Sequence, residues 1–277
     1  MQSGEARGRE SPLERMIRVY DSALVRHRRG YYDNSGFFNF GYWGLGARSQ
    51  REACEALVDQ LVGRIAVKGG RILDVACGVG ASTRRLIDSY AAELIVAINI
   101  SEAQIAEAKK LVPECTFLQM DATRLDFSDD RFDAVICVEA AFHFDTREDF
   151  LREVLRVLKP GGSLVLSDIL YRKLATPLVA PTHVPRANFV PDVATYGLLL
   201  KRVGFDAVDV QDATAVCLGR FRQNLARWPM TQHKAGRLKF HTALLRAAMA
   251  RAVAWYFGAT CKAYVLASAR KPARPAS

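Results

Sequence analysis

Several features that mark particular classes of protein are missing from these 277 residues. No stretch approaches the roughly 18 uncharged apolar residues that a membrane-spanning helix needs. The polar residues 1–10 lack the apolar core of a secretory signal. The six cysteines are scattered, without the close pairs that zinc sites and disulfide scaffolds use. These absences predict a cytoplasmic protein with reduced thiols and no metal centre.

Acidic residues are absent from the last part of the chain. Residues 213–277 contain no Asp or Glu but hold twelve Lys or Arg, so the net charge of +10 is concentrated there. Such a block could attract an anionic substrate, a phospholipid surface or nucleic acid. It could equally serve only to keep the protein in solution, because the sequence does not say whether these charges share one face.

Apolar strands and helical patterns alternate between residues 71 and 168. The strand-like runs are 72–76, 94–98, 116–120, 134–138 and 163–168, with a last one at 262–268. Helical patterns cover 82–89, 101–111 and 146–158, and the Lys-Pro-Gly-Gly of residues 159–162 ends the third. Because the first five runs are apolar throughout, they predict parallel strands covered on both faces, and so a doubly wound α/β core.

Three segments lie outside this core. Residues 11–14 form a capping box with proline at the first helical position, which predicts a helix. The apolar residues on one face of that helix are Leu13, Met16, Ile17, Tyr20 and Leu24. An aromatic-rich segment follows at 31–43, and a proline-punctuated insertion at about 171–191 predicts a substrate lid. We therefore separate a cover segment, 1–49, from a main domain, 50–277, and expect the first helix to contribute to the pocket and to a homo-oligomer.

The most informative motif follows the first predicted strand. Residues 73–80 read Leu-Asp-Val-Ala-Cys-Gly-Val-Gly, and Thr83 stands where a dinucleotide-binding turn has its third glycine. This string resembles the first motif of class I S-adenosylmethionine (SAM) methyltransferases, and further matches run in order from Gly41 to about Asp212. The resemblance implies a Rossmann-like, seven-stranded sheet with helices on both faces, SAM as cofactor and S-adenosylhomocysteine (SAH) as product.

The resemblance also implies which residues hold the methionine end of SAM. They are Tyr42, Trp43, Asp74, Ala76, Gly78 and Gly80. The two glycines would let the turn approach the ligand closely. Asp74 would favour the ammonium and sulfonium charges, or cap the amides of its own turn. The aromatic pair would cover the ligand, or simply pack in the core.

Residues that follow the second and third strands would bind the adenosine end of SAM. Asn99 would bind the ribose hydroxyls, where an acidic residue is usual. Ile100 would flank the adenine, with Gln104 one turn into the next helix. Asp121 looks like the family's acceptor for the adenine amine, with the Ala122 amide donating to the ring; its alternative is an ordinary turn residue.

Polar residues at the ends of the fourth and fifth strands are the candidates for chemistry. Because both ends open onto one crevice, His143 could act as a base that Asp168 orients. This pattern resembles O-methyltransferases of sugars and other natural products. The alternative is that His143 packs between its phenylalanine neighbours. We expect Glu139, a charge at the end of an apolar strand, to lie at the cofactor.

The remaining features suggest a hydrophobic substrate. The aromatic residues predicted to contact it are Tyr20, Tyr32, Phe38, Tyr196 and Phe221. Nucleic-acid methyltransferases of this fold carry an Asn/Asp-Pro-Pro-aromatic string where this chain has Glu-Ala-Ala-Phe, which argues against nucleic acid as substrate. We expect methyl transfer to a small hydrophobic natural product, with O-methylation slightly ahead of C-methylation. The alternatives are C-methylation of a prenyl, terpenoid or lipid-like substrate through a carbocation, with the basic end contacting a membrane surface, and a non-catalytic SAM-binding or interaction module.

Overall fold

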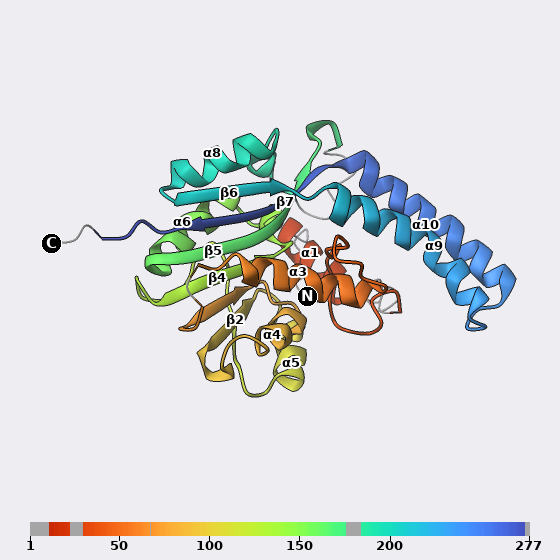
Figure 1. Cartoon of the computed structure of the whole chain (residues 1–277), viewed down its shortest axis with the longest axis horizontal. Coiled ribbons are helices and arrows are strands. Elements are labelled where there is room, and N and C mark those ends of the chain that lie inside the picture. Colours follow the sequence, from red (N-terminus) through yellow and green to blue (C-terminus); the bar gives the residue numbers. More distant parts are fainter. Residues whose placement is uncertain (1–10, 23–29, 67, 176–183, 275–277) are drawn as a thin grey trace, which may run out of the picture.

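A mixed sheet of seven strands forms the centre of the protein in a computed structural model that describes residues 11–22, 30–66, 68–175 and 184–274 (Figure 1). The strands are β1 (Ile72–Val75), β2 (Ile95–Asn99), β3 (Thr116–Gln119), β4 (Phe132–Val138), β5 (Leu158–Tyr171), β6 (Asp206–Asp212) and β7 (Cys261–Arg270). Their order across the sheet is β3-β2-β1-β4-β5-β7-β6. β7 runs antiparallel to β5 and β6, and the other neighbours are parallel. The predicted seven-stranded α/β architecture is confirmed.

Helices cover both faces of this sheet, and others lie beside it. The α-helices of the described residues are α1 (Pro12–Asp21), α3 (Gln50–Gly63), α4 (Ala81–Leu86), α5 (Glu102–Leu111), α6 (Arg147–Val157), α8 (Val193–Val203), α9 (Arg220–Lys234) and α10 (Phe240–Thr260). None of these helices, within the residues described, is long and apolar enough to cross a bilayer.

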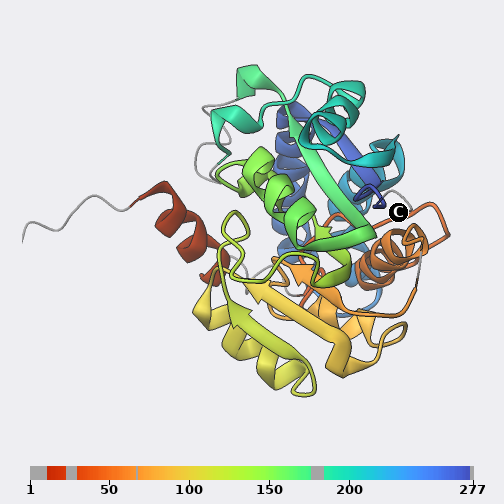
Figure 2. The same ribbon diagram turned by 90° about the vertical axis from the view of Figure 1, so that its left-hand side faces the viewer.

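The core has two halves because successive side chains of a strand point to opposite faces. One half joins α3 to the sheet and includes Leu57, Leu61, Ile72, Ala134 and Ile136. The other joins α6 and α8 to the sheet and includes Leu73, Val135, Phe150, Leu151 and Leu200. Figure 2 shows the sheet lying between α6 on one side and α3 on the other. Both faces of the central strands are therefore dry, which explains why their sequences are apolar throughout.

The predicted strands and helices of the core match the structure to within a few residues, with two differences. The 159–162 segment follows the end of α6, as predicted, but belongs to β5, which begins at Leu158. The sequence pattern did not predict α3, α8, β6 or the pair α9 and α10. Of the predicted lid, the structure describes 171–175 and 184–191, where short helical turns lie at Lys173–Ala175 and Arg186–Asn188.

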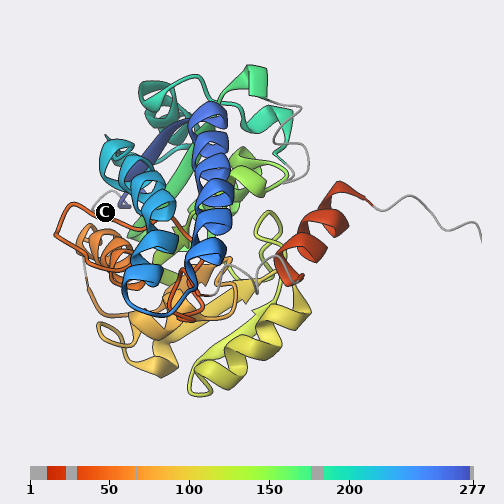
Figure 3. The ribbon, with the colours of Figure 1, turned by 90° about the vertical axis from the view of Figure 1, so that its right-hand side faces the viewer.

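The first helix begins as predicted. The Ser11 hydroxyl accepts from the Glu14 amide at 3.2 Å, and the Ser11 amide donates to the Glu14 carboxylate at 2.7 Å. α1 stands apart from the two helical layers, beside α5 (Figures 2 and 3). Leu24, the last residue of the predicted apolar face, lies outside the described residues. The contribution of α1 to a homo-oligomer stays a prediction.

Candidate functional site

A cavity of about 510 Å³ lies where the carboxyl ends of the parallel strands meet α1. Its floor consists of the turns that follow β1, β2, β3 and β4, four neighbours in the sheet. Its roof comes from Leu13, Met16, Ile17 and Tyr20 of α1, together with residues 36–39 of the aromatic segment. Ligands of open α/β sheets bind at this edge. The amino-terminal helix therefore contributes to the pocket, as its apolar face suggested.

The two glycines after β1 have different roles. Gly78 has a φ of +57°, and a Cβ there would meet only the Gln104 Oε1 atom, at 3.7 Å. Its backbone is thus bare toward the cavity, as close approach of a ligand requires. Gly80 does not line the cavity; a Cβ there would lie 3.1 Å from the Ala108 Cβ of α5. Gly80 thus lets α4 and α5 pack closely, and its predicted contact with the cofactor stays a prediction.

Asp74 lies behind the same turn and does not line the cavity. One carboxylate oxygen accepts from the hydroxyls of Ser82 at 2.8 Å and Thr83 at 2.7 Å. Its other oxygen, Oδ1, is buried without a hydrogen-bond partner among the described residues. Burial raises the pKa of Asp74 to about 6, against the lowering effect of the two hydroxyls. Asp74 therefore fastens the start of α4 to β1, as the second of its two predicted roles requires, and its contact with the cofactor stays a prediction.

A chain of polar side chains runs along the cavity at the end of β2. The side-chain amide of Asn99 donates from Nδ2 to Gln104 Oε1 at 3.2 Å, and Gln104 Nε2 donates to the Asp21 carboxylate of α1 at 2.7 Å. The Ser101 hydroxyl, which caps α5, lies 3.0 Å from both oxygens of Asp21. Asn99 and Gln104 line the cavity beside Ile100, as predicted. Asp21 brings to this place the carboxylate that β2 itself lacks.

The turn after β3 presents an acceptor beside a donor. Asp121 Oδ1 accepts from the amide and the hydroxyl of Thr123, both at 2.8 Å. Asp121 Oδ2 and the Ala122 amide make no hydrogen bond within the described part of the chain, and both residues line the cavity. An acceptor next to a donor matches the amine and ring nitrogen of adenine. Together with the bare Gly78 backbone and the Asn99 and Gln104 amides, these groups fit SAM. Ala76 lines the same wall.

Glu139, at the end of β4, is an acidic residue that lines the cavity. Its Oε2 atom accepts from the Phe40 amide and the Tyr264 hydroxyl, both at 2.8 Å. Desolvation by burial raises the pKa of Glu139 to about 8, while these two donors oppose the rise. At neutral pH the carboxyl group is therefore mostly protonated, and its carboxylate form is a stronger base than that of an ordinary glutamate.

His143 faces the cavity from the short helical turn at Ala141–His143. Its Nε2 atom lies 2.8 Å from the Tyr20 hydroxyl of α1, and the two rings meet edge to face at 5.4 Å. The Phe142 ring lies 4.0 Å from the imidazole, centroid to centroid. The position of His143 is compatible with both predicted alternatives, because the imidazole packs against the Phe142 ring and also lines the cavity.

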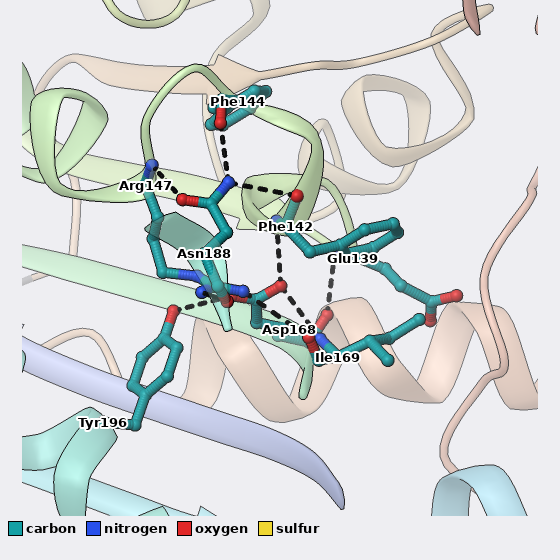
Figure 4. Close-up of polar contacts among 9 residues, drawn as sticks. Glu139, Phe142, Phe144, Arg147, Asp168, Ile169, Asn188 and Tyr196 are labelled. Carbon is teal, nitrogen blue, oxygen red and sulfur yellow. Dashed lines mark hydrogen bonds and ion pairs between the residues drawn. The ribbon is translucent and has the colours of Figure 1, made fainter. Parts of the chain in front are cut away.

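Asp168 does not orient His143. Its Oδ2 atom pairs with Arg147 at 2.7 Å and accepts from the Tyr196 hydroxyl at 2.9 Å, while Oδ1 accepts from the Phe142 and Ile169 amides (Figure 4). The Asp168 side chain is 0% exposed. The predicted base–carboxylate pair is corrected because both oxygens of Asp168 already bind other donors.

The Arg147–Asp168 pair supports the loop that carries His143. Asn188, from the predicted lid, donates to the carbonyls of Phe142 at 3.1 Å and Phe144 at 2.6 Å. It also accepts from the Arg147 amide at 2.8 Å, and the Arg147 guanidinium donates to the Asn188 carbonyl. Figure 4 shows this network on one side of the loop and the Glu139 carboxylate on the other.

Several aromatic residues predicted to contact ligands are structural. Tyr196 is fully buried on Asp168, and Phe221 stacks on Phe40 at 4.6 Å. The Trp43 indole donates to the Phe40 carbonyl at 3.0 Å. Tyr42 packs against the half of the core that joins α3 to the sheet. Tyr32 stacks at 5.2 Å on Phe38, which lines the cavity. Of the predicted substrate contacts, Tyr20 and Phe38 thus face the cavity, and the other three are corrected.

The sequence analysis missed residues whose roles depend on distant partners. Arg147 looked like an ordinary residue of a helix start, and nothing in its spacing relates it to Asp168. Asn188 lies in an insertion without a motif. Asp21 ends a helix whose position over the sheet the sequence does not specify. Only the apolar face of α1 carried a signal, and that signal did give the roof of the cavity.

Known proteins resemble this chain in both sequence and fold. Residues 73–166 match the family described as "Methyltransferase domain". Erythromycin 3''-O-methyltransferase from Saccharopolyspora erythraea is 30% identical over 195 residues, which cover 63% of this chain and 63% of that protein. Methyltransferase GfsG from Streptomyces halstedii is 30% identical over 209 residues, covering 70% of this chain and 74% of its own length.

The crystal structure of the [4+2]-cyclase SpnF superposes with a TM-score of 0.68 at 26% identity, covering 94% of this chain and 97% of the cyclase. The likeness therefore extends beyond the sheet to nearly the whole chain.

Proposed function

Because the chain belongs to the class I SAM-dependent methyltransferases of the small-molecule type, we propose that it methylates a hydroxyl group of a small, largely hydrophobic natural product. One observation carries this proposal. A single cavity joins the groups that fit SAM to His143, beneath the apolar roof of α1. The erythromycin relative, an O-methyltransferase by name, supports the same acceptor atom.

SAM, when bound, supplies an activated methyl carbon, so the chain's own residues have to bind, orient and deprotonate. Asp121 and Ala122 would hold the adenine edge, and Asn99 with Gln104 the ribose hydroxyls. Transfer to a hydroxyl needs a base, and His143 is placed to accept the proton at Nε2. The Tyr20 hydroxyl occupies that nitrogen at 2.8 Å, so an entering hydroxyl replaces Tyr20 or passes its proton through it.

The walls around His143 support a hydrophobic substrate. They include Leu13, Met16, Ile17, Phe37, Phe38, Phe142 and Phe144. Apolar walls bind apolar surface and exclude water from the acceptor hydroxyl. α1 covers one side of the cavity with its apolar residues.

Transfer to carbon is the second candidate, and Glu139 favours it. Methylation of an alkene produces a carbocation, which aromatic ring faces stabilise and a base must then deprotonate. The rings of Tyr20, Phe38 and Phe142 line the cavity, and Glu139 has its pKa raised to about 8 in the same wall. Either His143 or Glu139 would take the proton.

The test is turnover with a panel of hydrophobic alcohols and alkenes, using SAM labelled in its methyl group. We expect labelled methyl ethers from the wild type, loss of transfer in His143→Ala and unchanged SAH binding in that variant. Labelled C-methyl products, abolished by Glu139→Gln, would instead establish the second candidate. SAH binding without transfer to any member of either class would favour a binding module.

A further inference from the structure

The helical pair α9 and α10 forms a hairpin that projects from the sheet. In the chain it connects β6 to β7, and it projects from the edge of the sheet at which β6 ends and β7 begins, with its tip at residues 235–239 (Figure 1). Figure 3 shows the two helices side by side along their length. The α10 residues buried in the structure, Ala243, Ala247 and Ala254, recur at helical spacing and so form one face.

Five large apolar side chains of α10 are exposed, spread around the sides of the helix that do not carry the buried alanines. Phe240, Leu244, Leu245, Met249 and Trp255 are each 53–67% exposed. A surface helix ordinarily presents polar residues to water, and contiguous exposed apolar side chains mark an interaction surface. The outer face of this hairpin therefore fits a partner that accepts apolar side chains.

The charge of the hairpin is of one sign. Residues 220–260 contain no Asp or Glu. The cations exposed on it are Arg220, Arg227, Lys234, Arg237, Lys239, Arg246 and Arg251. Among the described residues, no ion pair involves any of them. Elsewhere in the acid-free block, Lys271 and Arg274 are both paired with Asp130. The excess charge thus remains available on the hairpin.

These two properties together select the partner. A second copy meeting this face by twofold symmetry would bring arginines against arginines. Nucleic acid would satisfy the cations but leaves Leu245, Met249 and Trp255 without an apolar partner. A bilayer containing anionic lipid offers negative head groups above an apolar interior, and tryptophan favours that boundary. We propose that the α9–α10 hairpin docks the protein on an anionic lipid surface.

Vesicle co-sedimentation of the full chain tests the proposal. The probes are vesicles of phosphatidylcholine alone and of phosphatidylcholine mixed with phosphatidylglycerol. We expect binding to the anionic vesicles that falls with added salt, and little binding to the neutral ones. Arg246→Gln with Arg251→Gln should weaken partitioning on the order of 25-fold, about fivefold for each cation. Leu245→Gln with Met249→Gln should weaken it by at least tenfold.

Matched controls lie on α8, away from the hairpin. Leu198→Gln removes an equally exposed leucine, and Lys201→Gln removes an exposed cation; neither should change vesicle binding. SAH affinity, measured for every variant, reports that the fold is intact.

Three results would overturn the proposal. The first is that the wild type ignores phosphatidylglycerol. The second is that the Leu245/Met249 double variant binds anionic vesicles as the wild type does, because then only charge acts and nucleic acid fits better. The third is a stable dimer, seen by sedimentation velocity, that the same double variant dissociates.

Discussion

The two ends of the cavity are held in place differently. At the cofactor end, Asn99 binds Gln104 and Asp121 binds Thr123, which are partners close in the chain, while the contacts of Ser101 and Gln104 with Asp21 add a link to α1. At the other end, the contacts join distant segments: Tyr20 to His143 across 123 positions, and Asn188 to Phe142 across 46. The groups that fit SAM thus come from turns that follow strands, whereas the loop that carries His143 is held by contacts between distant segments.

Two neighbouring carboxylates make the same contrast. Asp168 at β5 has both oxygens bound and pairs with a buried arginine, so it serves the fold. Glu139 at β4 has its hydrogen bonds on one oxygen and lines the cavity, so it remains open to chemistry. Position at a strand end therefore does not by itself make an acid catalytic.

The largest effect should come from breaking the structural carboxylate. Asp168→Asn leaves the Arg147 charge buried without its partner, and we expect the free energy of unfolding to fall by about 3–5 kcal/mol in urea titration. Tyr196→Phe removes one donor to the same oxygen and should cost about 1 kcal/mol. Adding Arg147→Gln to Asp168→Asn should recover part of the loss. A variant as stable as the wild type but without methyl transfer would restore Asp168 to a catalytic role.

The second effect concerns pH. The folded pKa of Glu139, about 8, lies above its ordinary value of 4.5, so the folded state holds this proton more tightly than the unfolded state. Glu139 therefore stabilises the fold below about pH 4.5, and that contribution is lost as pH rises toward 8. The loss approaches about 1.4 kcal/mol per pH unit at its steepest.

Glu139→Gln keeps the shape of the side chain without the titration. The difference in unfolding free energy between wild type and Glu139→Gln should change steadily between pH 5 and 8, in favour of the variant at the higher pH. A difference that stays constant over this range would show that the Glu139 pKa is not raised.

A smaller effect is expected at the contact between α1 and His143. Tyr20→Phe removes the hydrogen bond between the Tyr20 hydroxyl and His143, which is worth about 1 kcal/mol. We therefore expect kcat to fall roughly fivefold. SAH affinity should not change, because the Tyr20 hydroxyl binds His143 and not one of the groups that fit SAM. A change in SAH affinity with kcat preserved would place Tyr20 at the cofactor instead.

The smallest effect is expected where α1 meets α5. Asp21→Asn weakens the contacts with Ser101 and Gln104 at the mouth of the cavity, and we expect SAH affinity to fall about threefold, by analogy with an exposed charged pair. Glu107→Gln, farther along α5, is the matched control and should leave affinity unchanged. Tighter SAH binding in Asp21→Asn would mean that Asp21 competes with the ribose.

The difference between the two ends also explains what sequence could predict. Gly78, Asn99 and Asp121 were found because their roles come from turns that follow predictable strands. The partner of Asp168 was not found because Arg147 starts another helix, and no local spacing relates the two. The absence of Asp and Glu from residues 213–277 was visible in the sequence. Which residues of α10 are exposed, however, depends on how α9 packs against that helix.

Binding of the cofactor and handling of the proton fall to different residues of one cavity, Asp121 after β3 and His143 after β4. Calorimetric titration with SAH of the wild type, Asp121→Ala and His143→Ala tests it most directly. The account predicts that Asp121→Ala weakens binding by at least tenfold, whereas His143→Ala binds as the wild type does. Equal loss in both variants, or loss in His143→Ala alone, would contradict the division of the cavity.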